Sequence, residues 1–542
     1  MGLAARFFLL MREARRTGAA LVLLMMASVP EVQAQSSPPL APPPAPPPPE
    51  TPCRYHLVYA ADGATTVRVS LECSGVAPGR ATFVMPRAVP MGYGEQPYDR
   101  YVRELRAFST TGSPFKVDRE TRDSTPAGAA RPAPPEDAPR WRLEPPAIGG
   151  VRLGRVEYDV DLAAMERDIL SAADTSKVRP GYAGILGYSV YGYIEGHEDK
   201  AIQVEISAPE GWPAFTTLAP QAPAAVSSAT AAASDFYALA DSQILLGPKF
   251  DLRRTEVNGD AADVPLFVAV YGEGPADVAR ITTEAEVTLE RIMDYFGAPD
   301  FLHYTVHMEL LKPVSERHRY FFSMEHLNSA TFYLDHESGL RAETAAPQVS
   351  RTRSLFAHHF AHAWIPKRAY GAGYFPHLWE TAPVLDTIWF SEGFAQYAAI
   401  DALADAQHDQ ASVFRGRWVQ HRFRATLTEV PPFMLRLPLV ELSRIASTRY
   451  SEDFRVGRAT YSRGGLMAAE MDDYIRASTN GQKRLRDGLR HLVKWSRRER
   501  RAFRIEELPA IFQEATGVDT RSILEKWLAP YSREQKQAAS PQ

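Results

Sequence analysis

Apolar and polar residues alternate along much of the first half of the chain, which is the pattern of half-buried β-strands. Residues 67–71 alternate clearly, and similar runs cover residues 151–162, with one slip of phase, and residues 204–207. Successive side chains of a strand point to opposite faces, so each run can bury one face and expose the other. The pattern predicts an N-terminal β-sandwich-like domain over residues 53–252.

Two stretches interrupt the alternation within this domain. Residues 118–146 are rich in Pro, Ala, Arg and Asp, and residues 222–234 are rich in Ala and Ser. Segments with few large apolar side chains bury too little surface to pack as regular elements. We therefore predict that both stretches are mobile surface loops.

The period of the apolar positions changes after a strand-like run at residues 266–271. Apolar side chains then recur at helical spacing from Val278 to Phe296, and Gly297 is typical of a helix end. Two further strand-like runs follow between residues 304 and 334. A mixed domain of helices and strands is therefore predicted over residues 263–403.

Helical periodicity dominates beyond residue 403. The predicted helices cover residues 464–477, 482–495, 505–515 and 520–528. A basic run at residues 497–501 is predicted to be a solvated surface loop. The expected fold class is α+β: the N-terminal β domain, the mixed domain, a C-terminal helical domain over residues 404–530 and a disordered tail at residues 531–542.

The N-terminus has the order of a secretory signal. A positive region ends at Arg16, an apolar run covers residues 19–27, and small residues close the segment at Ala34. This order predicts a signal peptide at residues 1–34 and an exported protein, periplasmic or secreted. The apolar run is short of the ~20 residues that span a bilayer, so no transmembrane helix is expected after cleavage. An uncleaved membrane anchor, extended by residues 7–10, is the alternative.

Composition bounds the remaining possibilities. At 542 residues the chain exceeds the roughly 250–300 residues at which a single core stops growing, so two or three domains are expected. Residues 35–52 are mostly Pro and predict a stiff linker after the signal peptide. The net charge of −4 offers no basic surface for nucleic acid. Nothing in the composition indicates an oligomeric state.

The chain has two cysteines, Cys53 and Cys73, which flank two strand-like runs with Asp62 and Gly63 as a turn signal between them. The register of such a hairpin places the cysteines nearly opposite each other. In an oxidising compartment this predicts a disulfide. Two free buried thiols are the alternative.

Two histidines four residues apart indicate the chemistry of the mixed domain. His358 and His362 lie in a run of good helix formers, so on a helix both imidazoles project from one face. This spacing suits two ligands of one zinc ion. Glu392, in a second helix-compatible run, offers a carboxylate as third ligand and leaves the fourth position open. The alternative is a pair of ordinary helix histidines.

These residues, with several other motifs, resemble the glycyl aminopeptidase family of zinc gluzincins, metallopeptidases with a β-rich N-terminal domain and a thermolysin-like catalytic domain. The matching pieces are residues 83–86, Arg100, Tyr101, residues 208–212, 243–247 and 324–329, Trp364, Lys367, Arg368 and residues 389–394. The resemblance covers about residues 84–527. It implies a thermolysin-like zinc peptidase domain at residues 263–403.

The resemblance also implies a role for individual residues. It implies zinc as cofactor with His358, His362 and Glu392 as ligands, and a peptide as substrate. It further implies that Glu325 holds the N-terminal ammonium of the peptide and that the hydroxyl of Tyr461 stabilises the oxyanion. Without the motifs around them, Glu325 and Tyr461 fit a surface carboxylate and a core tyrosine.

Two positions depart from the family pattern. His359 stands where the family has the glutamate that takes a proton from the attacking water, and residues 320–323 replace small, glycine-rich backbone. A neutral imidazole, with an unperturbed pKa of ~6.5, can accept a proton but resists positive charge beside zinc. As an extra ligand His359 is awkward, because it lies ~100° around the helix from His358.

Two functions follow from these departures. The first is a metallo-aminopeptidase that removes small N-terminal residues, with His359 and Tyr461 as catalytic residues. The alternative is an impaired pseudopeptidase that keeps the fold and zinc as a peptide- or protein-binding scaffold.

Overall fold

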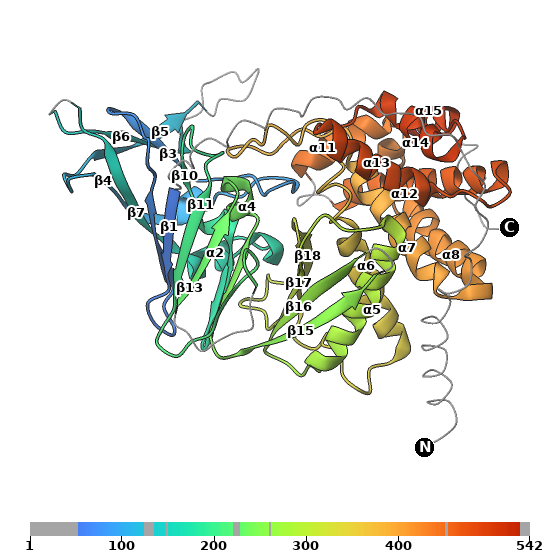
Figure 1. Ribbon diagram of the computed structural model, residues 1–542, viewed down its shortest axis with the longest axis horizontal. Helices are drawn as coiled ribbons and strands as arrows, with labels where there is room; N and C mark the ends of the chain where they lie inside the picture. The colour runs from blue at the N-terminus through green and yellow to red at the C-terminus, as the bar shows by residue number, and fades with distance from the viewer. Residues whose placement is uncertain are drawn as a thin grey trace, which may run out of the picture. The chain divides into compact units, whose positions relative to one another are not determined.

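The strands predicted from the alternating pattern are present in the computed structural model (Figure 1). The structure describes residues 53–123, 135–147, 150–220, 228–259, 262–449 and 454–531. The predicted signal peptide, the linker and all but the first residue of the predicted tail lie outside these residues.

The first sheet of the N-terminal domain is built on the predicted hairpin. β1 (Cys53–Val58) and β2 (Thr66–Glu72) pair antiparallel, and β1 also pairs in parallel with β11 (Ile202–Ser207). The sheet has the order β13-β11-β1-β2-β7-β4, in which β13 is Ser228–Ala233, β7 is Leu153–Asp161 and β4 is Val102–Ser109. Alternate side chains of β1 and β2 are buried in the domain core, as their sequence pattern predicts.

A second sheet, with the order β10-β3-β6-β5, closes this core. Its strands are β10 (Tyr193–Ile194), β3 (Ala81–Val84), β6 (Glu136–Glu144) and β5 (Lys116–Arg122). The ring of Phe83 in β3 lies 5.0 Å from that of Tyr158 in β7 and 5.7 Å from that of Trp141 in β6. The two sheets therefore share one aromatic core, and the β-sandwich-like prediction is confirmed.

The two stretches predicted as loops contain strands, so these predictions are wrong for the described residues. β6 and most of β5 fall within residues 118–146, and β13 falls within residues 222–234. β5 and β13 are sheet edges, where one side of the backbone pairs and the side chains stay partly exposed. Small and charged residues are tolerated there. A charge pair adds to the pairing, because Arg140 Nε lies 3.5 Å from Glu120 Oε2.

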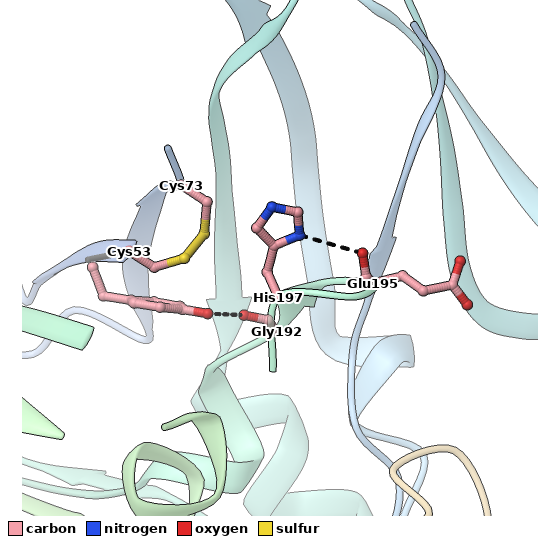
Figure 2. The surroundings of a disulfide bond; sticks show 6 residues. Cys53, Cys73, Gly192, Glu195 and His197 are labelled. Atoms are coloured by element: carbon pink, nitrogen blue, oxygen red, sulfur yellow. Dashed lines mark hydrogen bonds between the residues drawn. A yellow bond between two sulfur atoms is a disulfide. The ribbon is translucent and has the colours of Figure 1, made fainter. Parts of the chain in front are cut away.

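The first hairpin is closed by a disulfide between Cys53 and Cys73 (Figure 2). The bond joins residues 20 apart in sequence. A loop of this length restricts the unfolded chain and should stabilise the fold by about 3 kcal/mol. We expect no free thiol in denatured, unreduced protein, and we expect Cys53→Ser with Cys73→Ser to lower the free energy of unfolding by about 3 kcal/mol. Two free thiols by titration in exported protein would contradict the pairing.

A third sheet joins the N-terminal domain to the mixed domain. It has the order β12-β14-β9-β8, with β12 at Ala214–Thr216, β14 at Gln243–Leu246, β9 at Tyr182–Leu186 and β8 at Lys177–Arg179. Tyr182 of β9 stacks on Tyr271 of the mixed domain, with ring centroids 3.9 Å apart. The ring of Phe215 in β12 also contacts that of Phe267, at a tilt of 45° and with centroids 6.1 Å apart.

Five strands in the order β15-β16-β17-β19-β18 form the sheet of the mixed domain. They are β15 (Phe250–Asn258), β16 (Asp263–Gly272), β17 (Tyr304–Leu311), β19 (Ser329–Asp335) and β18 (Phe321–Glu325). β16, β17 and β19 are parallel, and the edge strands β15 and β18 run antiparallel to their neighbours. β15 pairs with β16 from Phe250 onward. The N-terminal domain therefore ends before residue 250, slightly earlier than the predicted residue 252.

Two helices, α5 (Val278–Phe296) and α6 (Ala346–Ala361), pack on this sheet and on each other. The carboxylate of Asp277 caps α5 by accepting a hydrogen bond from the backbone N–H of Arg280 at 3.1 Å. The helix ends at Gly297, where φ is 90°, as the sequence predicts. The second helix, α6, carries the predicted histidine pair.

The helices beyond residue 404 continue the core of the mixed domain. They include α8 (Ala411–Val419), α11 (Leu439–Arg449), α12 (Phe454–Ser478), α13 (Leu485–Glu499), α14 (Leu508–Thr516) and α15 (Arg521–Leu528). One apolar cluster extends from Val257 of β15 to Trp527 of α15. The helical region predicted at residues 404–530 is present, and it shares this apolar core with the mixed domain. None of the described helices is long and apolar enough to cross a membrane.

The basic run at residues 497–501 is helical in its first part, so its prediction as a loop is wrong there. α13 extends to Glu499 because Leu492 and Trp495 continue its buried face. Charged residues on the opposite face do not stop such a helix. Just after the helix, the guanidinium of Arg501 lies over the ring of Trp495, 4.6 Å from its centroid.

Candidate active site

The end of α6 presents the histidine pair to the interior. His358 is in the last turn of the helix, and His362 follows its last residue with backbone angles that are still helical. The side chains therefore project from one face, as the four-residue spacing predicts. Their Nε2 atoms lie 3.2 Å apart, and both residues are buried.

Glu392 reaches the same point from a π-helical turn, Trp389–Phe394, which leads into α7 (Ala395–Asp405). Such widened turns occur often at functional sites. Glu392 Oε2 lies 3.4 Å from His358 Nε2 and 3.5 Å from His362 Nε2. The structure thus brings the three predicted zinc ligands together.

The three donor atoms fit a zinc ion. Bond lengths of ~2.0–2.1 Å place neighbouring ligands of a tetrahedral ion ~3.3 Å apart. The separations here are 3.2, 3.4 and 3.5 Å. Glu392 Oε2 is buried and has no hydrogen-bond donor among the described residues, which leaves its lone pairs for a cation.

Contacts behind the ligands orient them. His362 Nδ1 donates a hydrogen bond to the carbonyl of Ile365 at 2.9 Å. This places a proton on Nδ1 and directs Nε2 at the other ligands, so that Nε2 can give its lone pair to a metal ion that displaces its proton. The second oxygen of Glu392, Oε1, accepts a hydrogen bond from the hydroxyl of Tyr93 at 2.7 Å.

The carboxylates beside the histidine pair favour the binding of a cation. Burial lowers the pKa of His358 to about 4. Burial also disfavours a charged His362, but the carboxylates of Glu325 and Glu392 outweigh it and raise the pKa of His362 to about 9. Two buried carboxylates thus attract positive charge to one small volume.

Glu325 is the last residue of the edge strand β18 and is buried beside the histidines. Burial opposes its ionisation, but the positive charge of His362 outweighs the burial and lowers the pKa of Glu325 to about 2. The turn after the strand is held by Asp241, which accepts hydrogen bonds from the backbone N–H of Leu327 at 2.6 Å and from His326 Nδ1 at 3.0 Å. The structure therefore places an ionised carboxylate at the edge of the predicted metal site.

His359 lies between the histidine pair and β18. Its Nε2 atom is 2.6 Å from the hydroxyl of Ser323, and its Nδ1 atom is 3.6 Å from Glu325 Oε2. The second distance is too long for a hydrogen bond. The two departures from the family pattern, at position 359 and in residues 320–323, are therefore in direct contact.

Tyr461 lies on α12, and its ring centroid is 5.8 Å from that of His358. The approach of α12 to the turn that carries Glu392 depends on two glycines. A side chain at Gly393 would meet the backbone of Gly464 at 2.5 Å, and one at Gly464 would meet the carbonyl of Trp389 at 2.0 Å. Close helix packing thus brings Tyr461 to the same site.

The site opens into a cleft of about 1650 Å³. It is lined from the N-terminal domain by Tyr93, Arg100 and Tyr101, from the mixed domain by β18 and α6, and from the C-terminal helices by α12. The volume exceeds the ~300–1,000 Å³ of small-molecule pockets and suits a longer, extended ligand.

Two residues at the site were not predicted individually from the sequence. Tyr93 is 299 positions away from the carboxylate that it contacts, and Ser323 is 36 positions away from His359. The only local signal at Tyr93 is its place between Gly92 and Gly94.

A helix with His-x-x-x-His, a glutamate on the following helical segment and a carboxylate on the edge strand of a mixed sheet define a metallopeptidase of the zinc gluzincin class. A model of the peptidase M61 N-terminal domain matches residues 54–248, and a model of the M61 glycyl aminopeptidase matches residues 351–428. The chain belongs to the M61 glycyl aminopeptidase family.

Solved structures share the fold. An aminopeptidase N family protein from Idiomarina loihiensis superposes with a TM-score of 0.71 at 18% identity, over 89% of this chain and 76% of that chain. An M1 zinc metallopeptidase from Deinococcus radiodurans gives a TM-score of 0.51 at 16% identity, over 89% and 93%. A variant of that enzyme bound to a Tyr-Ser-Ala substrate gives 0.52 at 17% identity, over 89% and 94%. No curated protein sequence gives a significant match. The α+β prediction is confirmed.

Proposed function

We propose that the protein is an exported, zinc-dependent aminopeptidase that removes small N-terminal residues from peptides slowly. The observation that carries the proposal is the triangle formed by His358 Nε2, His362 Nε2 and Glu392 Oε2 beside the ionised Glu325. A zinc ion held by the triangle would supply Lewis-acid activation of water and of the scissile carbonyl. The signal-like sequence at residues 1–34 and the disulfide support export.

Glu325 accounts for action at the N-terminus of the peptide. Donor atoms of Glu325, His359 and His362 all lie within 4.8 Å of one another. A substrate ammonium bound to Glu325 would therefore hold the first peptide bond beside the metal ligands. Tyr461 would donate its hydroxyl proton to the oxyanion as a hydrogen bond.

His359 accounts for slow turnover. Burial lowers the pKa of His359, so the imidazole is neutral and has one nitrogen that can accept a proton. If the Ser323 hydroxyl donates to Nε2, that acceptor is already occupied. A base in this state takes the proton of the attacking water poorly.

Peptide binding without turnover is the second candidate function. The same contact between Ser323 and His359 favours it, because the two side chains form a hydrogen bond with each other and His359 Nε2 is then not available to the attacking water. The cleft, Glu325 and the metal triangle serve binding equally well.

The experiment tests whether cleavage requires a free N-terminus on the peptide. We expect zinc-loaded protein to release glycine from Gly-Gly-Phe and to leave N-acetylated Gly-Gly-Phe intact. Glu325→Gln should lower kcat/KM at least about 30-fold, since losing one partner of a buried charge pair costs about 2 kcal/mol or more. The control is Glu316→Gln, at an exposed carboxylate.

Two outcomes would overturn the assignment. Equal cleavage of the acetylated peptide would exclude an aminopeptidase. Tight binding of the free peptide with no release of glycine would establish the second candidate instead.

A further inference from the structure

The carboxylate of Glu392 has different surroundings at its two oxygens. Oε2 faces both histidine Nε2 atoms at 3.4 and 3.5 Å. Oε1 accepts the hydroxyl hydrogen bond of Tyr93 at 2.7 Å. One oxygen is therefore directed at the metal position and the other is held by a neutral donor.

Tyr93 comes from the N-terminal domain, whereas the three ligands come from the mixed domain. The segment that carries it is buried at Met91, which is 1% exposed and adopts the left-handed backbone conformation with φ of 53°. Such conformations persist only where the surroundings hold them. The backbone just before Tyr93 is thus held in one particular conformation.

Residues of the mixed domain and of α11 hold this segment on both sides of Tyr93. The ammonium of Lys367 donates to the carbonyl of Pro90 at 2.9 Å, and the backbone N–H of Gly94 donates to the carbonyl of Ser447 at 2.9 Å. Both contacts lie within three residues of Tyr93. They hold the backbone before and after Tyr93, and so limit where its phenol can lie.

From these contacts we infer that Tyr93 is a positioning residue of the metal site: its hydroxyl holds Glu392 so that a single oxygen faces the metal. The inference rests on the proposed zinc site and adds that the N-terminal domain completes it. Partners of metal ligands typically change metal affinity 10–100-fold. A carboxylate released from Tyr93 can turn and offer both oxygens, which changes the coordination geometry.

The experiment compares two tyrosines of the same segment, the partly buried Tyr93 and the buried Tyr98. Tyr93→Phe removes the hydroxyl on Glu392. Tyr98→Phe removes a hydroxyl that donates to the carbonyl of Asp174 at 2.8 Å, without contact to a predicted ligand. Each variant loses one hydroxyl, and thermal unfolding of the metal-free proteins measures how far each substitution destabilises the fold.

Zinc affinity, measured for the full chain by competition with a chelator, is expected to fall at least about 10-fold in Tyr93→Phe. In Tyr98→Phe it should stay at the wild-type value. The cobalt-loaded Tyr93→Phe protein should also show a changed visible spectrum, because an added carboxylate oxygen alters the ligand field.

Wild-type affinity and spectrum in Tyr93→Phe would overturn the inference and leave the proposed function standing. An equal loss of affinity in both variants would also overturn it, because the effect would then be general destabilisation. A wild-type protein that binds no zinc would overturn the proposed metal site and the inference together.

Discussion

The His359→Glu variant, loaded with zinc, is expected to release N-terminal glycine or alanine at least about 10-fold faster than the wild type, because a general base commonly contributes ~10²–10⁴-fold. His359 lies beside Glu325 and His362, so a carboxylate at this position reaches the same small volume. A carboxylate also avoids the positive charge that an imidazole acquires when it takes a proton near a metal ion. The measurement is the rate of amino-acid release from Gly- and Ala-initiated peptides.

Ser323 influences the size of this gain. Its hydroxyl is 2.6 Å from His359 Nε2 and can also donate to a carboxylate introduced at position 359. Such a bond lowers the basicity of the carboxylate and holds it towards β18. Adding Ser323→Gly to His359→Glu should therefore raise the rate further, whereas Ser323→Gly alone should give a smaller gain.

The control for this gain in rate removes Glu325, the residue proposed to bind the substrate ammonium. Adding Glu325→Ala to His359→Glu should remove the gain, because the substrate loses its charge partner. If the wild type already cleaves such peptides well and His359→Glu makes no difference or harms it, then imidazole is an effective base and slow turnover is refuted.

His362→Ala should hold almost no zinc after dialysis against a mild chelator, whereas the wild type should keep about one ion per chain, as a site with three protein ligands does. His362 is fully buried, and its Nε2 atom is one corner of the triangle of predicted metal ligands. Its Nδ1 atom donates a hydrogen bond to the carbonyl of Ile365. Two remaining ligands at a buried site cannot replace it. Metal analysis of both proteins gives the result directly.

His359→Ala is the matched control for this loss. His359 neighbours the ligand His358 on α6, but its Nε2 atom contacts Ser323 instead of the triangle. Its zinc content should therefore equal that of the wild type. Equal, near-zero zinc in wild type and His362→Ala would reject the site, and loss of zinc in His359→Ala would make His359 a ligand.

Much of the site could be predicted because it depends on local geometry. The four-residue spacing of His358 and His362 determines a common face on any helix, and the alternation in β1 and β2 determines which side chains are buried. These relations involve neighbours in sequence. They needed no knowledge of where the helix or the strands lie in the molecule.

The errors arose where partners distant in sequence override local composition. β5 and β13 have the composition of loops but pair at sheet edges. The basic run at residues 497–501 has the composition of a loop, yet its first part continues α13 because Leu492 and Trp495 of that helix pack into the core. Packing between distant segments decided each case.

The sequence by itself determined the class of protein and the chemistry of its metal ligands, since ligand type and helical spacing are properties of a few neighbouring residues. Only the tertiary structure showed that His359 meets Ser323 and that Tyr93 of the N-terminal domain holds Glu392. Such contacts join segments far apart in sequence. Their distances follow from how the sheets and helices pack, which no local pattern records.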